Sequence, residues 1–283
     1  MNWSKGLAEW IEGDTAYISV VFSWRLPEAY QRAVWLSSQG YKVRAGGPAT
    51  FARPRYLEDV ADLGGTVDAL IHHNPDATMA SRGCPVKCYF CIVPNMEGIE
   101  FTLLPDFTPR PILCDNNLSA LPVDYQEYII EKYTKSGVRL SDCNSGFEPR
   151  TFDSDTYNRW RQIYKGRWRF GYDENSEGVY VKRMTVILKD EKQWNKRVFV
   201  LIGNEPFESC YERIMKVIEW GCEPYAQPMI ALNSLTKKPI IRYDWTPQKL
   251  KDLARWTNRW NWRYFPFSEY NRGGKPTNGS DTN

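Results

Sequence analysis

The 283-residue sequence predicts an α/β protein whose strands form a mostly parallel sheet, either open or curled into a partial barrel. Three observations predict this class. Apolar runs of strand length recur along the chain, amphipathic helical patterns separate them, and glycines or prolines mark most of the boundaries. Alternation of this kind is typical of βαβ units, in which each helix crosses over the sheet and neighbouring strands run parallel.

Residues 1–75 predict a small α/β half-domain. Its expected elements, in chain order, are a strand at 15–22, a helix at 27–39, a strand at 41–47, a helix at 55–63 and a strand at 67–72. Gly40 ends the first helical pattern, and the Asn74-Pro75 pair follows the last apolar run. We therefore place a domain boundary at residue 75.

Residues 76–270 continue the same alternation as a larger domain. Strands are expected at 78–81, 110–114, 137–143, 167–173, 196–203 and 224–232, and helices at 124–136, 154–164, 177–190 and 206–220. Thr246, a capping residue, precedes Pro247 at the first position of a final helix. Residues 271–283 have the composition of a disordered tail.

The composition is that of an ordinary soluble globular protein, with 42% hydrophobic and 25% charged residues. No apolar run is long enough to span a membrane, and the first residues do not resemble a secretory signal. A cytoplasmic location is therefore expected, and there clustered cysteines indicate metal binding or chemistry rather than disulfides. The net charge of +3 is too small to indicate a nucleic-acid partner by itself.

Three of the seven cysteines, Cys84, Cys88 and Cys91, lie within the segment GCPVKCYFC. The spacing C-x3-C-x2-C can bring three thiolates to one inorganic centre, and thiolates suit zinc or an iron-sulfur cluster. A structural zinc site needs a fourth ligand, which the segment lacks. The candidates for it, none at a zinc-finger offset, are Cys114, Cys143, His72 and His73. A four-iron cluster held by three cysteines would instead leave one iron open for catalysis.

The cysteine segment resembles the signature of the radical S-adenosylmethionine (radical SAM) superfamily, which is C-x3-C-x2-C after the first strand, with an aromatic residue directly before the last cysteine. Phe90 takes the aromatic place, and residues 78–81 form the expected strand before it. The resemblance covers about residues 76–245 and implies a partial (β/α)6 TIM-like barrel with a 4Fe-4S cluster and S-adenosylmethionine. It implies reductive cleavage of S-adenosylmethionine, hydrogen abstraction from a substrate, and an electron donor such as flavodoxin or ferredoxin.

The resemblance also implies where the cosubstrate would bind. The implied positions are Phe90, Asn116, Asn117, Arg150, Asp173, Ile202 and Glu205. Arg150 would pair with the methionine carboxylate, and either Asp173 or Glu174 would bind the ribose hydroxyls. From the residues alone, Arg150 is as readily a salt-bridged surface charge. Candidates for contact with the substrate are Cys114, Asn144, Glu148 and Glu174.

Residues 1–75 resemble the early part of a cobalamin-binding domain. The pattern Asp-x-His-x-x-Gly that supplies the lower ligand of cobalamin is absent, and the segment is short for that fold. Cobalamin is therefore not expected, and the segment is interpreted as a degenerate half-domain. His72 and His73 are expected in an exposed loop, or else as a proton donor or ligand near the active site.

The substrate class is suggested by aromatic and arginine content. The chain has 12 Trp and 17 Tyr, and residues 255–267 alternate arginine with aromatic residues. This pattern favours a nucleic-acid base or nucleotide as substrate, although such a segment also suits a helix that closes a barrel. A second class of function stays open, namely a zinc-stabilised, non-catalytic module that binds nucleic acid.

Overall fold

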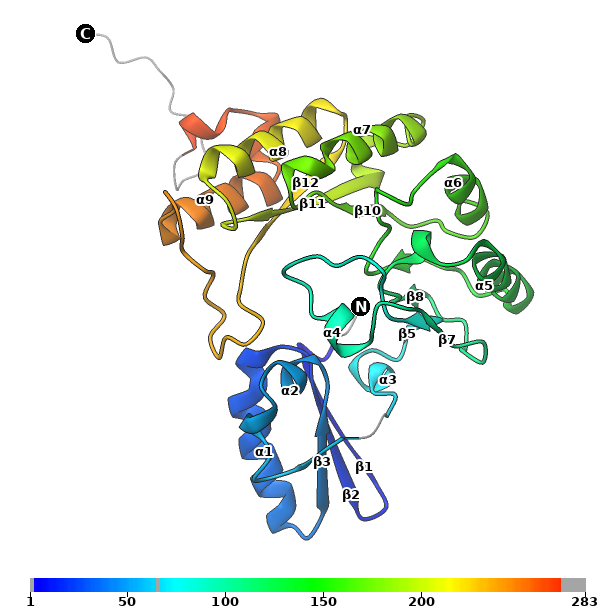
Figure 1. Ribbon diagram of the computed structural model, residues 1–283, viewed down its shortest axis with the longest axis vertical. Coiled ribbons are helices and arrows are strands. Elements are labelled where there is room, and N and C mark those ends of the chain that lie inside the picture. The colour runs from blue at the N-terminus through cyan, green and yellow to red at the C-terminus, as the bar shows by residue number, and fades with distance from the viewer. Residues whose placement is uncertain (1–2, 65–66, 271–283) are drawn as a thin grey trace. The chain divides into compact units, whose positions relative to one another are not determined.

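The computed structural model describes residues 3–64 and 67–270 and divides the chain into two compact units, whose elements are labelled in Figure 1. Unit 1 comprises residues up to 146, 159–166 and 230–238, and unit 2 comprises residues 147–158, 167–229 and those from 239 onward. The predicted tail, residues 271–283, lies outside the described residues. The predicted domain boundary at residue 75 stays a prediction.

Unit 1 begins with a four-stranded sheet in the order β1-β2-β3-β4. Its strands are β1 (Leu7–Glu12), β2 (Thr15–Val20), β3 (Lys42–Gly46) and β4 (Asp62–Leu63). β1 and β2 form an antiparallel hairpin, whereas β2, β3 and β4 are parallel. Helix α1 (Leu26–Ser38) crosses from β2 to β3, and its Leu26, Ala29, Ala33 and Leu36 are buried against Ile18, Val20 and Val43 of the sheet.

Two expectations for the N-terminal region are wrong, and one strand was missed. Strand β1 was not predicted; residues 55–63 form no helix beyond a short turn at Pro54–Tyr56; and residues 67–72 are not a strand but lead into α3 (Leu70–His73). Leu57 is buried in the core of the sheet and Asp62 pairs with β3, so tertiary contacts decide the conformation here. Periodicity alone does not separate helix from strand over such short apolar runs. A further short helix, α2 (Pro48–Ala52), follows β3.

Unit 1 also contains a three-stranded parallel sheet in the order β5-β8-β9. Its strands are β5 (Ala77–Thr78), β8 (Ile112–Leu113) and β9 (Asp142–Cys143). Helix α5 (Val123–Ser136) crosses from β8 to β9 and ends at Gly137, whose φ of 70° places it in the left-handed region, as is typical of a helix C-terminus. Between β5 and β8, the hairpin of β6 (Ser81–Arg82) and β7 (Thr102–Leu103) flanks α4 (Val93–Met96).

Unit 2 is built on a parallel sheet in the order β10-β11-β12. Its strands are β10 (Trp168–Gly171), β11 (Lys196–Ile202) and β12 (Glu223–Pro228), connected by α7 (Gly178–Ile187) and α8 (Phe207–Glu219). α6 (Ser154–Trp160) precedes β10 along the chain. Figure 1 shows α7 and α8 along the same side of the sheet, as successive right-handed crossovers require.

The C-terminal helix α9 (Pro247–Asn258) covers the edge of β12. The Asn258 side chain accepts a hydrogen bond from the backbone N–H of Ala226 (2.8 Å) and donates one to its carbonyl (2.9 Å). The predicted N-cap is confirmed, because the Thr246 hydroxyl accepts from the backbone of Lys249. Trp256 is buried and packs against Phe267, so this part of the aromatic segment serves packing.

The α/β class is confirmed, and the six strands expected after residue 76 are present in the predicted order. Their backbone hydrogen bonds, however, join them as two three-stranded sheets, one in each unit, and within the described residues no sheet closes into a barrel. The partial (β/α)6 barrel therefore stays a prediction. No helix in the described part of the chain is both long and apolar enough to cross a membrane.

Candidate functional site

The cysteine loop, residues 83–98, leaves β6 and is closed at its base by Glu97. One carboxylate oxygen of Glu97 accepts from Arg82 (3.0 Å), and the other accepts from the backbone of Gly83 (3.0 Å) and the amide of Asn116 (2.7 Å). The backbone N–H of Cys84 donates to the carbonyl of Gly98 (3.2 Å). The two ends of the loop are therefore fixed to each other and to the segment that follows β8.

Gly83 is required by the geometry of this base. Its φ is 87°, and a Cβ atom there would lie 2.2 Å from the carbonyl oxygen of Glu100. An L side chain is strained at this φ, and backbone atoms cannot yield as a flexible side chain does. Any substitution at Gly83 would open the base of the cysteine loop.

The segment Asp115-Asn116-Asn117 holds the start of the cysteine loop. Asp115 is buried and accepts hydrogen bonds from the backbone of Ala80 (2.9 Å) and the hydroxyl of Ser81 (2.5 Å). The Asn117 amide donates toward the sulfur of Cys84 (3.7 Å), and its oxygen accepts from the backbone of Ala120. Asn116 and Asn117 were predicted to meet the cosubstrate; in the structure their side chains bind the loop, and the predicted role stays a prediction.

Asp115 gives the stability of this segment a pH dependence. Burial raises the pKa of Asp115 from 3.8 to about 6. A raised folded-state pKa means that the protonated acid is favoured by folding, so the stabilisation is complete below about pH 4 and is lost as the pH rises through about 6. Relative to Asp115→Asn, which cannot ionise, the wild type should lose up to about 3 kcal/mol of unfolding free energy between those pH values.

Urea denaturation of both proteins at several pH values measures this difference. Asp124→Asn supplies the control, because it removes a carboxyl group that is exposed rather than buried. Parallel curves for the wild type and Asp115→Asn would show that the buried carboxyl does not titrate as stated.

The three cysteines of the loop are partly exposed, and none of them forms a disulfide. The backbone of Cys91 donates to the carbonyl of Cys88 (3.0 Å), which forms a tight turn, and Phe90 packs edge to face on Tyr89 (5.2 Å). Burial raises the pKa of the Cys91 thiol, with a smaller contribution from nearby Cys84. The thiolate form is therefore disfavoured at this position unless a cation lies beside it.

The donor set of the loop fits a centre with three protein thiolates, but the ligands are not gathered. Within the described residues, no three Cys, His, Asp or Glu side chains are placed to hold a metal ion together. The candidates for a fourth zinc ligand include His73, which is buried rather than in an exposed loop, with hydrogen bonds to Ser4 (2.5 Å) and Ser19 (2.9 Å). Both of its ring nitrogens are thus engaged.

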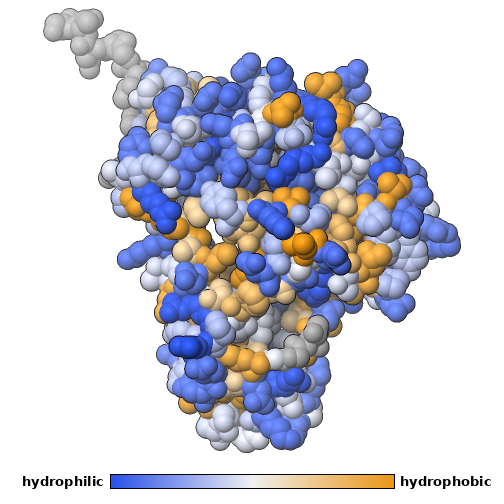
Figure 2. Space-filling model, in the orientation of Figure 1, coloured by the Kyte–Doolittle hydropathy of each residue, from blue (hydrophilic) through white to orange (hydrophobic). Residues whose placement is uncertain are grey.

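Unit 1 contains a cavity of about 1090 Å³ that is open to solvent. Cys114 and Asn144, two of the predicted substrate contacts, line it, and so do Arg82 and Met96 at the ends of the cysteine loop. Figure 2 shows apolar side chains among hydrophilic ones on the surface of the N-terminal elements, which supply much of the cavity wall. The other two predicted substrate contacts, Glu148 and Glu174, belong to unit 2.

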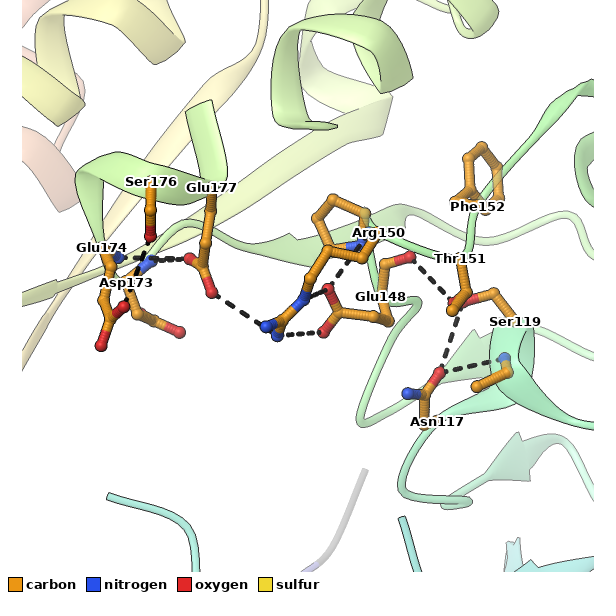
Figure 3. A network of polar contacts seen from close by, with 12 residues as sticks. Asn117, Ser119, Glu148, Arg150, Thr151, Phe152, Asp173, Glu174, Ser176 and Glu177 are labelled. Carbon is orange, nitrogen blue, oxygen red and sulfur yellow. Dashed lines mark hydrogen bonds and ion pairs between the residues drawn. The ribbon is translucent and has the colours of Figure 1, made fainter. Parts of the chain in front are cut away.

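Unit 2 contains the remaining predicted residues, and Arg150 forms an ion-pair network there (Figure 3). Its Nε donates to one oxygen of Glu148 (2.6 Å), its Nη2 donates to the other (3.1 Å), and Glu177 lies 3.5 Å away. The guanidinium that was predicted to hold the cosubstrate carboxylate is therefore paired with carboxylates of the chain itself. The predicted role would require Arg150 to exchange Glu148 for the ligand.

Asp173 is the second residue after β10 and precedes Glu174, the other residue expected to bind the ribose hydroxyls. Its carboxylate accepts from the backbone of Leu201 (3.1 Å), and its own N–H donates to Glu177 (2.6 Å). Burial, with the neighbouring charge of Glu177, raises the pKa of Asp173 to about 7. A carboxyl group that titrates near neutrality can either donate or accept a hydrogen bond, so it suits a hydroxyl partner chemically. Glu174 is exposed and caps the following turn.

Ile202 is fully buried on β11, and Glu205 forms an ion pair with Arg213 of α8. Arg213 is itself fully buried and donates to the carbonyl of Leu201 (3.0 Å). Arg213 was not predicted, although a signal was present: with Cys210, Ile214 and Val217 it occupies the buried face of the helix, where a lone charge needs a partner. The roles predicted for Ile202 and Glu205 stay predictions.

No family model matches the sequence, and no curated protein matches it. Among solved structures, the chain is similar to the radical S-adenosylmethionine methyltransferase TsrM from Kitasatospora setae, whose structure contains cobalamin and a [4Fe-4S] cluster. The TM-score is 0.56 at 10% sequence identity, over 77% of this chain and 64% of that chain. The likeness concerns the fold alone: over most of its length the chain is similar in fold to about two thirds of that structure.

Proposed function

We propose that the chain is a radical SAM enzyme that holds one 4Fe-4S cluster on Cys84, Cys88 and Cys91. The observation that carries the proposal is the C-x3-C-x2-C loop, which is fixed at its base and follows β5, the first strand of the β5-β8-β9 sheet, in a fold similar to that of TsrM. Three thiolates from one loop are the donor set of a cluster with one open iron. When bound, such a cluster supplies the electron that cleaves S-adenosylmethionine.

The residues around the loop have definite tasks in this proposal. Glu97 and Asn116 keep the ends of the loop together. Less conformational entropy is therefore lost when the three cysteines bind one centre than if the loop had no fixed ends. Asn117 donates toward the sulfur of Cys84, and such a hydrogen bond stabilises a thiolate. The electron donor, of the flavodoxin or ferredoxin type, remains part of the proposal.

Anaerobic reconstitution with iron and sulfide tests the proposal. The reconstituted protein should be brown and, after reduction with dithionite in the presence of S-adenosylmethionine, should release 5'-deoxyadenosine, which chromatography detects. A colourless protein that retains one zinc ion and forms no 5'-deoxyadenosine would support the non-catalytic, zinc-stabilised module instead.

A further inference from the structure

The cavity of unit 1 lies at the carboxyl ends of the parallel strands of two sheets. The residues that directly follow the six parallel strands β2, β3, β4, β5, β8 and β9 are Val21, Gly47, Gly64, Met79, Cys114 and Asn144. All six line the cavity. Ligands of open α/β sheets bind outside the carboxyl ends of the strands, so this placement indicates a binding site rather than a packing defect.

The cavity wall is mostly apolar and offers flat aromatic surfaces. Trp10 and Tyr17 occupy paired positions on β1 and β2, with their rings stacked at 5.1 Å and an interplanar angle of 10°. Phe22 and Phe51 also line the cavity and remain 41% and 47% exposed. Exposed apolar side chains around a cavity mark a site for a ligand with an apolar face, and stacked rings favour a planar one.

The polar part of the wall carries excess positive charge. Arg44 pairs with Tyr17 across the sheet and bonds to the carbonyl of Gly64 (3.0 Å). In the described part of the chain neither Arg44 nor Lys5, which also lines the cavity, forms an ion pair. The acidic Glu97 is already bonded to Arg82, Gly83 and Asn116. This part of the wall is therefore suited to bind an anionic group of a ligand.

An occupant of the cavity would lie against the cysteine loop, because Arg82 and Met96 border both. Of the two histidines in the sequence, His73 lines the cavity but has both ring nitrogens hydrogen-bonded, and His72 does not line it. The wall thus favours an organic ligand over a metal-centred macrocycle that needs imidazole ligation.

We propose that this cavity binds a planar aromatic molecule that carries an anionic group, and that this molecule is the substrate. Its role as substrate rests on the proposed function, whereas its binding does not. A nucleoside monophosphate combines both features and is the first probe. An aromatic carboxylate, which also has a planar ring and an anionic group, is the second probe. Comparing the two probes shows whether the ligand is a nucleotide or another aromatic anion.

Equilibrium dialysis with the protein prepared without iron tests the binding alone. GMP should bind saturably, guanosine at least about tenfold more weakly because it lacks the charge, and ribose 5-phosphate not measurably because it lacks the ring. Binding of indole-3-acetate in place of GMP would support the aromatic-anion class and identify a source other than nucleotides. Absence of binding by GMP and indole-3-acetate alike would overturn the proposal.

Two variants locate the binding. Gly46 lines the cavity, and a Cβ built there meets no atom within 4 Å, so Gly46→Phe places a ring in the cavity without a backbone clash. It should weaken binding at least about tenfold, whereas Gly46→Ala should not. Arg44→Gln should weaken binding of the anion by about tenfold or more, whereas Lys42→Gln, on the same strand but 75% exposed and paired with Asp14, should leave it unchanged.

Binding that persists unchanged in Gly46→Phe, or hydroxocobalamin that displaces GMP from the wild type, would overturn the assignment of the cavity. The two proposals fail separately. If the protein binds GMP but shows no cluster chemistry, only the proposed radical SAM function is wrong. If the cluster is functional but nothing binds in the cavity, only this inference is wrong.

Discussion

Replacing any one of Cys84, Cys88 and Cys91 by alanine is expected to abolish iron binding and to lower 5'-deoxyadenosine formation by more than about 100-fold. The expected loss is large because each cysteine is one of only three protein ligands, and two thiolates do not hold a four-iron cluster. Iron content per chain after anaerobic reconstitution and the rate of 5'-deoxyadenosine release are the two measurements.

Cys222→Ala is the matched control for these cysteine variants. Cys222 is also a free cysteine, but it is fully buried in unit 2, where burial raises its pKa to about 11. A thiol in that environment stays protonated and inert, so the variant should retain iron and activity. If all three loop variants retain iron, Cys84, Cys88 and Cys91 are not its ligands. If Cys222→Ala loses as much iron as they do, the loss in the loop variants is due to misfolding.

Arg213→Met is expected to lower the unfolding free energy by about 2–4 kcal/mol, the largest effect on stability of the substitutions considered. Arg213 is fully buried, pairs with Glu205 and donates to the carbonyl of Leu201. Methionine fills most of the volume but leaves these acceptors without their donor, which costs more than the pair itself contributes. Chemical denaturation followed by circular dichroism measures the change.

Lys216→Met on the same helix is the control for Arg213→Met. Lys216 pairs with Glu212 at the surface (2.7 Å), and exposed pairs of this spacing contribute about 0.5 kcal/mol or less. If Arg213→Met changes stability no more than Lys216→Met, the buried guanidinium does not anchor α8 as the structure indicates.

Much of the fold could be predicted from local sequence. Thr246-Pro247 was predicted to begin a helix through capping, and this is confirmed. The helix expected at 124–136 does end at Ser136, where Gly137 adopts the left-handed geometry of a helix C-terminus. The errors at 55–63 and 67–72 fall on short apolar runs, where packing of Leu57 and pairing of Asp62 decide the outcome. The six strands after residue 76 are divided between the sheets β5-β8-β9 and β10-β11-β12, and this division is a tertiary property that local patterns do not encode.

Part of the candidate site could likewise be predicted from the sequence, and part could not. The spacing of the three cysteines and the aromatic place of Phe90 are visible in the sequence, because ligands on one loop are local. The closure of that loop by Glu97 was not predictable, since no local pattern links it to Gly83 and Asn116. The cavity was not predictable either, because it is formed by strand ends from two sheets that are far apart along the chain.

The central claim is that three protein thiolates hold the cluster and leave one iron open to S-adenosylmethionine. Electron paramagnetic resonance of the reduced, reconstituted protein, recorded with and without S-adenosylmethionine, tests this claim most directly. The cluster signal should shift when the cosubstrate is added, because its amino and carboxylate groups bind the open iron. A signal unchanged by saturating S-adenosylmethionine, from a metal centre held by four protein donors, would contradict the claim.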